Sequence, residues 1–398
     1  MNIVGIIAEY NPMHNGHLYH IKEAKRLANA EHAIVIMSGS FTEQGNICTL
    51  DKFTRAKIAI ENGADLVIEL PTIYSTSSAE MFAFGAVNIL NSLGVVTHLA
   101  FGSEASNIKD LETIANVCIT HKEDILEKSK EYIKNGFTHP RAYATALTEF
   151  LPENLSEETT KPNNILGIEY LKALKLLKSQ IKPVLVHRLN SSHSDIKILN
   201  TNEYASSTAI REALTYQDLE FAIDSIKNVV PKNTLDYIKA GNFNTNEKLW
   251  NMLKYEILKL NVQGLKNIAE VTEGLENRIY NACINSNSYD EFIFNTKAKR
   301  YTLSRIKRIC IYIILGITKD VKKHLSDANY IRILKVKKSS KHLLSKIAAN
   351  TTIPLITKIT DESLNKLDSV TSTSIKLDIL ANNLTGNIQE DYINNILC

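Results

Sequence analysis

The chain has 398 residues, 44% of them hydrophobic and 22% charged, and a formal net charge of +3, which is the composition of a large globular protein of two or three domains. Its five scattered cysteines form no C-x-x-C pair, which argues against a structural zinc site or a disulfide framework. With neither a secretory signal pattern nor an apolar run long enough to span a membrane, we expect a cytoplasmic protein.

Short apolar runs alternate with helical patterns over the first 190 residues. We expect strands at residues 3–8, 32–37, 64–70, 96–101 and 183–188, and helices at residues 18–30, 52–61, 79–93, 108–118 and 123–135. Strands that alternate with helices in this way form parallel sheets, because the crossover connections place helices on both faces. The sequence therefore predicts an α/β fold built on a Rossmann-like parallel sheet.

The turn between the first strand and the first helix carries two histidines on either side of a glycine. His14 and His17 can both project from the first helical turn, where unpaired backbone N–H groups and the helix dipole favour an anion. Gly16 lets a ligand approach the backbone, and imidazoles can donate hydrogen bonds to phosphoryl oxygens. The pattern H-N-G-H fits the adenylate-transfer signature H-x-G-H. Its place at the carboxyl end of the first strand favours nucleotide binding over a solvated surface turn.

Two later helix starts could add donors to the same cleft. Asp51, Lys52 and Arg55 open the second crossover helix, close enough to the first turn to face this cleft, and a capped helix with an internal ion pair is the alternative. At residues 205–211, A-S-S-T-A-I-R, small hydroxyl side chains begin a helix with Arg211 one turn in. This segment could hold a phosphate or only cap the helix, and its place after the last α/β strand favours the phosphate.

After residue 210 the pattern changes to successive helices with Leu/Ile/Lys periodicity. We therefore divide the chain into a catalytic domain, residues 1–215, and a mainly helical domain, residues 216–398, with a polar linker at residues 241–246. Residues 297–346 contain fifteen Lys or Arg against two acidic residues, a local balance of +13 that leaves −10 for the rest of the chain. Such a stretch is typical of nucleic-acid binding, and a solvated helix face whose acidic partners lie elsewhere is the alternative.

A series of motifs in the first 211 residues resembles one family. In order they are E-Y-N-P-M-H-N-G-H, S-G-S-F, D-K-F-T-R, G-A-D-L-V-I-E-L-P, F-G-S-E, P-N-N-I-L-G and S-S-T-A-I-R, and K-R-Y-T-L-S-R-I-K-R and Y-I-R-I-L-K follow later. The chain resembles the bacterial tRNA(Met) cytidine acetate ligases of the nucleotidyltransferase-like superfamily over nearly its whole length. The resemblance implies an enzyme that forms acetyl-adenylate from ATP and acetate and then acetylates N4 of the wobble cytidine in elongator tRNA(Met).

The resemblance also assigns ATP contacts by motif. They are Ile7, Ala8, Glu9, Tyr10, Asn11, Pro12, Met13, His14, Asn15, Gly16, His17, Leu18, Tyr19 and His20, together with Gly102, Asn163 and Arg188. Read from the sequence alone, Gly102 could equally be a structural turn, Asn163 a helix cap and Arg188 a solvated strand end. Mg²⁺ is expected with ATP, although no carboxylate cluster is evident that would hold it.

The mechanism we expect needs no protein nucleophile. Acetate attacks the α-phosphorus of ATP in line while pyrophosphate leaves, and the catalytic residues His14, His17, Lys52 and Arg211 position and neutralise the phosphates. The cytidine N4 then attacks the mixed anhydride, which requires the base to be splayed out of the RNA loop into the cleft.

One loop departs from the pattern of similar chains, which commonly show F-x-Q-R-G-x-P where this chain has F-T-E-Q-G-N-I at residues 41–47. The arginine is absent and Glu43 adds a negative charge, so we assign this loop no role in binding.

Two other functions stay open. A small-molecule adenylyl or cytidylyl transferase of cofactor synthesis has no need of the basic stretch, and a non-catalytic RNA-binding protein has no need of His14, Gly16, His17 and Arg211 together. Acetate selectivity, the choice of tRNA and the oligomeric state do not follow from the sequence.

Overall fold

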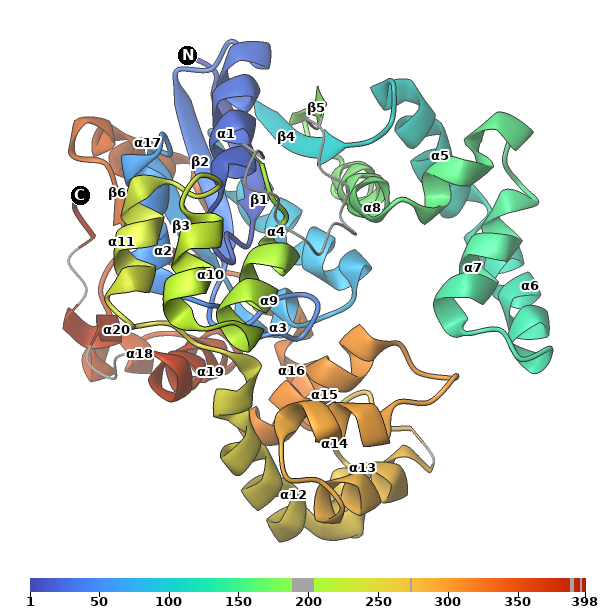
Figure 1. Cartoon of the computed structure of the whole chain (residues 1–398). Helices are drawn as coiled ribbons and strands as arrows, with labels where there is room; N and C mark the ends of the chain where they lie inside the picture. Colours follow the sequence, from blue (N-terminus) through green and yellow to red (C-terminus); the bar gives the residue numbers. More distant parts are fainter. Residues whose placement is uncertain (188–203, 273, 387–389, 394–395) are drawn as a thin grey trace.

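The computed structural model describes residues 1–187, 204–272, 274–386, 390–393 and 396–398. Its described part is organised around one seven-stranded sheet with the order β5-β4-β1-β2-β3-β6-β7 (Figure 1). The strands are β1 Ile3–Ala8, β2 His32–Ser38, β3 Leu66–Leu70, β4 His98–Ser103, β5 Lys182–His187, β6 Ile331–Val336 and β7 Leu355–Ile356. Strands β1 to β5 are parallel, β6 is antiparallel to β3, and β7 is parallel to β6. The predicted α/β fold with a Rossmann-like parallel sheet is confirmed.

Helices cover both faces of the sheet, because successive side chains of a buried parallel strand point to opposite faces and both sets are apolar. Val4 and Ile6 of β1 belong to one buried cluster and Ile3 to the other. The first cluster is closed by residues of α1 Asn15–Leu27, α2 Lys52–Glu61, α9 Ser207–Tyr216, α10 Leu219–Ile226 and α11 Lys232–Lys239.

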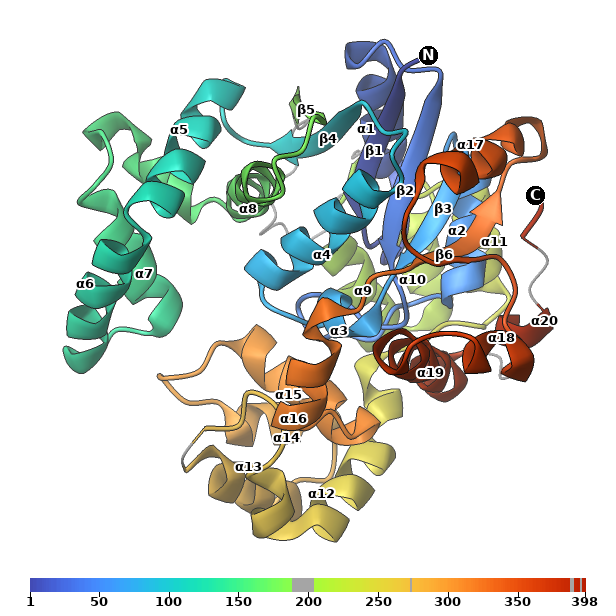
Figure 2. The ribbon, with the colours of Figure 1, turned by 180° about the vertical axis from the view of Figure 1, so that it is seen from behind.

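The second face carries the larger cluster, which includes residues of α4 and α8 (Figure 2). The helices between β3 and β5 are α3 Thr72–Ser75, α4 Ala79–Ser92, α5 Ile108–Thr120, α6 Lys122–Lys134, α7 His139–Thr148, the 3-10 helix η1 Glu153–Thr160 and α8 Pro162–Leu176. Helices α5 to α7 extend to one side of the sheet (Figure 1). None of the helices in the described part of the chain is both long enough and apolar enough to cross a membrane.

The second half of the chain begins with a helical unit below the sheet in Figures 1 and 2. It consists of η2 Asn246–Leu249, α12 Trp250–Leu265, α13 Leu275–Ile284, α14 Tyr289–Thr296, α15 Leu303–Leu315, α16 Lys319–His324 and η3 Leu325–Asp327. The chain then returns to the sheet through β6, η4 Lys338–Ser340, α17 His342–Asn350, β7, α18 Asp361–Asn365, α19 Ser369–Thr385 and α20 Glu390–Ile393. The C-terminal half is mainly helical, as expected.

The C-terminal half also contributes two strands, β6 and β7, which the predicted succession of helices did not include. Strand β6 pairs with the edge strand β3, with Ile68 opposite Ile333 and Glu69 opposite Arg332. The basic residues within I-R-I-L-K-V hid an otherwise apolar strand, because the long-range partner that buries Arg332 cannot be seen locally. Both buried clusters contain residues from either side of the predicted domain boundary between residues 215 and 216. The boundary itself stays a prediction.

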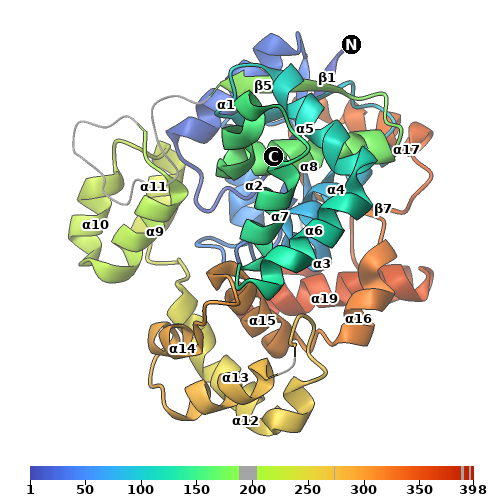
Figure 3. The same ribbon diagram turned by 90° about the vertical axis from the view of Figure 1, so that its right-hand side faces the viewer.

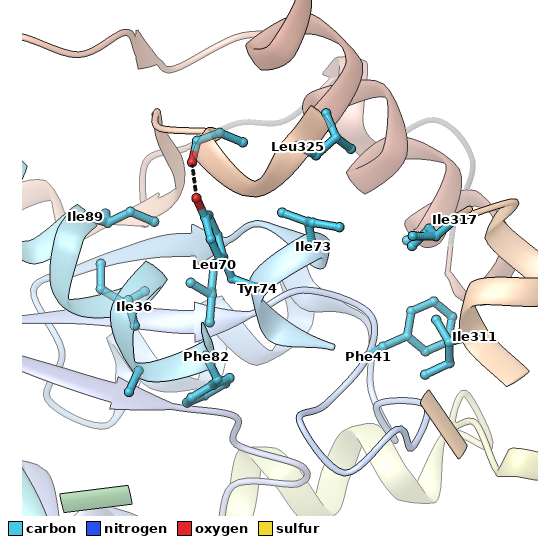
Figure 4. Close-up of a cluster of buried hydrophobic side chains, with 14 of the residues drawn as sticks. Ile36, Phe41, Leu70, Ile73, Tyr74, Phe82, Ile89, Ile311, Ile317 and Leu325 are labelled. Carbon is cyan, nitrogen blue, oxygen red and sulfur yellow. Dashed lines mark hydrogen bonds between the residues drawn. The ribbon is translucent and has the colours of Figure 1, made fainter. Parts of the chain in front are cut away.

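Figure 4 shows where the two halves share that core. Tyr74 of α3 packs among Ile36 and Phe82, while Ile311 and Leu325 approach from the second half of the chain. The hydroxyl of Tyr74 donates to the backbone carbonyls of Ser326 (2.8 Å) and Ala328 (2.9 Å). The helical unit is therefore attached to the sheet through a buried apolar contact rather than through the linker alone.

Candidate active site

An open cavity lies at the carboxyl ends of β1, β4 and β5, with about 1510 Å³ of space including its solvent-filled mouth. The chain proceeds from β1 outward to β2 and β3 and later crosses to β4 and β5 on the other side of β1, so this is the point where the strand order reverses. Ligands of open α/β sheets bind at such a point.

Most of the residues expected to contact ATP line this cavity. They are Ile7, Ala8, Glu9, Tyr10, Asn11, His14, Gly16, His17, Tyr19, His20, Gly102 and Asn163. Arg211, predicted as a catalytic residue, lines it too. The cavity lining does not include Pro12, Met13, Asn15 or Leu18, and Arg188 lies outside the described residues. Met13 is buried in the core, and Asn15 donates from its backbone to Val229 and from its side chain to the carbonyl of Asn228, both at 2.9 Å.

The H-N-G-H motif forms the N-terminal cap of α1. His14 is the N-cap residue, and its Nδ1 accepts a hydrogen bond from the backbone of Gly16 at 3.1 Å. In return, the backbone of His14 donates to Nδ1 of His17 at 3.2 Å, and the two rings stack with centroids 3.7 Å apart. The three-residue spacing is that of a capping box, in which each side chain satisfies the other end of the first turn. A Cβ at Gly16 would lie 2.9 Å from the His14 ring, so this position requires a glycine.

This cap decides which ring nitrogens can donate. Because Nδ1 of both histidines accepts a backbone N–H, the neutral rings carry their hydrogen on Nε2. Both rings line the cavity, and Tyr10 packs edge-on against His17 with centroids 4.9 Å apart. The motif therefore presents two imidazole N–H donors at the positive end of a helix, which suits a phosphate.

Arg211 meets this turn from α9. Its guanidinium donates to the carbonyl of Asn11 at 2.7 Å and to the hydroxyl of Thr208 at 3.1 Å. Ser206 caps α9 by accepting from the backbone of Ala209 at 3.0 Å, and residues 206–208 line the cavity. The starts of α1 and α9, separated by about 190 residues of sequence, thus face one cavity, with a half-buried guanidinium between them.

We expected Lys52 to face the cleft, but it does not. Its side chain is fully buried, with Nζ 2.9 Å from both Glu69 and Asp391, and it is not among the residues that line the cavity. Burial raises the pKa of Glu69, and the charge of Lys52 opposes that rise. The cap of the alternative interpretation is observed, with Asp51 accepting from the backbone of Phe53 and Thr54, but the ion pairs of Lys52 reach β3 and α20 instead of lying within the helix.

Arg55 supports the cavity from below without lining it. It is fully buried and donates to the carbonyls of Glu9 (2.7 Å), Ser38 (3.0 Å) and Leu50 (2.9 Å), and to that of Gly39. The carbonyls of Glu9, Ser38 and Gly39 lie where β1 and β2 end, and that of Leu50 lies just before α2. Arg55 therefore fixes the two loops that form the cavity wall.

The divergent loop, residues 41–47, lines the cavity with Glu43, Gln44 and Asn46 and connects it to the basic helix α15. The backbone of Glu43 donates to Glu9 at 2.8 Å, and its carboxylate lies 3.5 Å from Arg308. Burial raises the pKa of Glu43 to about 7, although Arg308 lowers it, and burial also raises the pKa of Glu9. The loop that we left without a role is therefore part of the cavity wall.

The opposite wall comes from β4 and α8. Asn163 lines the cavity and donates to Glu104, and because Lys161 is the N-cap of α8, Asn163 is not the cap. The neighbouring Asn164 is fully buried and accepts from Ser103 at 2.6 Å. Sequence reasoning missed the apolar and aromatic residues of this wall, namely Phe82, Phe101, Leu166, Tyr170 and Val186, with His187 and Tyr204 beside them. His187 is the last residue of β5 and Phe101 lies two residues before the end of β4, and nearness to a strand's carboxyl end is a signal that could have found them.

Within the described residues, no three His, Cys, Asp or Glu side chains gather in an arrangement that could hold a metal ion. Glu9 and Glu43 are two carboxylates that line the cavity, and each lies beside an arginine. The donor set of the described cavity is therefore suited to an anion through its imidazoles, guanidinium and helix starts.

Comparison with known proteins identifies the family. The family model described as HIGH Nucleotidyl Transferase matches residues 1–395. A tRNA(Met) cytidine acetate ligase of Clostridium perfringens is 38% identical over 408 aligned positions, which cover 99% of this chain and 98% of that protein. The corresponding ligase of Caldanaerobacter subterraneus is 40% identical and covers 90% of this chain and 89% of that protein. The chain belongs to the tRNA(Met) cytidine acetate ligase family. This confirms the family that the motifs indicated, and it makes the chain an enzyme of a ligase family.

Solved structures of a member of this ligase family share the whole fold. Apo TmcAL from Thermotoga maritima has a TM-score of 0.90 at 29% identity and covers 100% of this chain and 99% of its own. The same protein bound with α-thio-ATP has a TM-score of 0.87 and covers 98% of this chain and 96% of its own. Both the sheet and the returning C-terminal strands therefore belong to the fold of this ligase family.

Proposed function

We propose that the chain activates acetate with ATP as acetyl-adenylate and transfers the acetyl group to N4 of the wobble cytidine of elongator tRNA(Met). The observation that carries the proposal is the convergence of His14, His17 and Arg211 on the cavity at the strand-order reversal. Two further facts support it: the relatives are named tRNA(Met) cytidine acetate ligase, and Thermotoga maritima TmcAL binds α-thio-ATP.

In the first step, a carboxylate oxygen of acetate attacks the α-phosphorus of ATP. A new P–O bond forms, the bond to pyrophosphate breaks, and pyrophosphate leaves with the electron pair. His14 and His17 donate through Nε2 to the phosphates, and Arg211, held by Asn11 and Thr208, neutralises the charge of the leaving group. Lys52 has no part in this step, because its ammonium is buried against Glu69 and Asp391.

In the second step, the N4 amine attacks the acetyl carbonyl, the bond to AMP breaks, and the amine proton passes to solvent or to the departing phosphate. The nucleobase must leave its loop to reach the cavity, as bases do in other enzymes that modify them. Mg²⁺ would arrive with ATP and be held chiefly by its phosphates, since such ions often take only one or two protein carboxylates.

The proposal is tested by separating the two steps. Acetate-dependent exchange of labelled pyrophosphate into ATP measures the first, and incorporation of labelled acetate into elongator tRNA(Met), followed by nucleoside analysis, measures the second. We expect both activities, and a loss of about 10²- to 10³-fold in each for His17→Ala.

The matched control is His121→Ala, which removes a half-exposed histidine at the junction of α5 and α6. This variant should retain both activities. Label that reaches no RNA, with pyrophosphate released only when a small phosphorylated acceptor is supplied, would favour the cofactor-synthesis transferase instead. Unchanged exchange in His17→Ala would remove the histidine from the mechanism.

A further inference from the structure

Two aromatic side chains, one on α9 and one on α14, are mostly exposed to solvent. Phe294 of α14 is 77% exposed and Tyr216, the last residue of α9, is 68% exposed. Aromatic side chains are enriched at interaction surfaces, where their rings supply contact area. Neither ring is part of the buried clusters that hold the fold together.

The two rings lie at the contact between the end of α9 and the start of α14, which we call the seam. The hydroxyl of Tyr216 donates to the carboxylate of Asp290 at 2.7 Å, which joins the end of α9 to the start of α14. This hydrogen bond raises the pKa of Tyr216 to about 12. Phe294 stands four residues after Asp290 and therefore on the same side of α14, one turn away. Figure 3 shows α9 directly above α14. The bond to Asp290 holds the tyrosine ring in place while its faces remain exposed.

The seam runs from the cavity to the start of the basic stretch. At one end, Arg211 near the start of α9 lines the cavity. At the other end, residues 297–308 contain six Lys or Arg and no acidic residue. Lys307 links this stretch to the cavity, because its ammonium donates to Asn46 of the cavity wall at 2.9 Å. Asp290 and Glu212 are acidic groups beside this path, and the carboxylate of Asp290 is engaged by Tyr216.

We propose that Tyr216 and Phe294 form a stacking platform for unpaired nucleotides of a single-stranded RNA loop on its way to the cavity. The proposal rests on the function proposed above and adds the residues that hold the bases next to the reacting one. Every base offers a π-face, and stacking on an aromatic side chain contributes about 1–3 kcal/mol per base. Charge complementarity favours RNA over a protein partner, since the adjacent backbone would meet the exposed cations Lys297, Lys299 and Arg300.

The test compares Phe294→Ala and Tyr216→Ala with Tyr255→Ala. Tyr255 lies on α12 and is 63% exposed, so its removal changes exposed aromatic area without touching the seam. We expect each seam variant to raise KM for elongator tRNA(Met) by about 5- to 150-fold, the stacking energy of one base, with acetate-dependent pyrophosphate exchange unchanged. Tyr216→Phe, which keeps the ring but loses the bond to Asp290, should fall between Tyr216→Ala and the parent.

The outcomes separate the platform from the function on which it rests. If the parent shows neither exchange nor acetyl transfer to RNA, the proposed function fails. If the parent shows both and the seam variants keep the KM of the parent, the platform alone is refuted. If the variants bind RNA normally but lose self-association in light scattering, the surface belongs to a second copy of the chain. Equal effects of Tyr255→Ala and the seam variants would also overturn the proposal.

Discussion

Replacement of Gly45 by alanine tests whether the loop of residues 41–47 is clamped against α15. Gly45 has φ +76, and a Cβ placed there would lie 2.5 Å from the backbone nitrogen of Arg308 and 2.6 Å from the carbonyl carbon of Lys307. Helical backbone cannot move aside as the end of a side chain can. An alanine must therefore separate the loop from the helix.

The magnitude follows from comparison with Gly241, which has φ +75 but no atom within 4 Å of the position that a Cβ would take. Both alanine variants adopt the left-handed conformation at a cost of about 1–2 kcal/mol. Only Gly45→Ala also loses the hydrogen bond from Lys307 to Asn46 and the contact between Arg308 and Glu43. At about 0.5–1.5 kcal/mol each, these bring its expected loss to ~2–5 kcal/mol.

Urea unfolding measures this difference in two regions of the molecule. Fluorescence of Trp250, the single tryptophan, reports on the helical unit, and far-ultraviolet circular dichroism reports on the whole chain. We expect coincident transitions for the parent and for Gly241→Ala, and a lower midpoint with separated transitions for Gly45→Ala. Equal midpoints for the two alanine variants would refute the reasoning, because the contact with α15 would then contribute nothing.

Three further outcomes follow from buried groups. Lys52→Met should destabilise the fold by about 3–5 kcal/mol in urea unfolding, because it leaves the two buried carboxylates of Glu69 and Asp391 with Arg332 as their one remaining cation among the described residues, and should leave the Kd for ATP within about twofold. A lost ATP affinity in folded protein would return Lys52 to the site. The folded pKa of Glu43, about 7 against an ordinary 4.5, means that the fold binds its proton more tightly, so this carboxyl lowers stability as pH rises between those values. Glu43→Gln should match the parent near pH 4 and exceed it by up to ~3 kcal/mol at pH 8, and a constant difference across urea midpoints at the two values would contradict this. Iodoacetamide should label only the half-buried Cys398 in native protein, as mass spectrometry would show, since the four other thiols are buried.

The parts of this structure that the sequence predicted are those governed by local patterns. Strand β1 and helix α2 have the predicted bounds, because an uninterrupted apolar run ends at a turn in one case and Asp51 caps the other. The H-x-G-H turn could be placed at a strand end because consecutive residues define both the strand and the cap. The cavity contacts of His14, His17 and Arg211 follow from these same helix starts.

The parts that could not be predicted depend on partners far away in the sequence. Lys52 opens a helix beside the site, so its charge suggested a phosphate contact, but Glu69 and Asp391 bind it from β3 and α20. Asp391 is 339 positions later in the chain, and no local pattern reveals that pairing. Arg332 similarly made β6 look like part of a basic helix until Glu69 and Asp391 neutralised it.

The same reasoning changes the meaning of the basic stretch at residues 297–346. Strand β6 runs antiparallel to β3, with Arg332 opposite Glu69 at the carboxyl end of β3 and Val336 opposite Leu66 at its beginning. The exposed basic residues after β6 therefore lie at the amino ends of the parallel strands, away from the cavity at their carboxyl ends. Lys346 donates to Met1 there. Within the first part of the stretch, Arg308 and Lys322 are engaged by Glu270. The cations that remain exposed near the seam are Lys297, Lys299 and Arg300. The net charge of +13 along the sequence is thus larger than the charge of any single surface that could bind RNA. The part of the stretch that could bind RNA close to the cavity is the segment that follows Phe294.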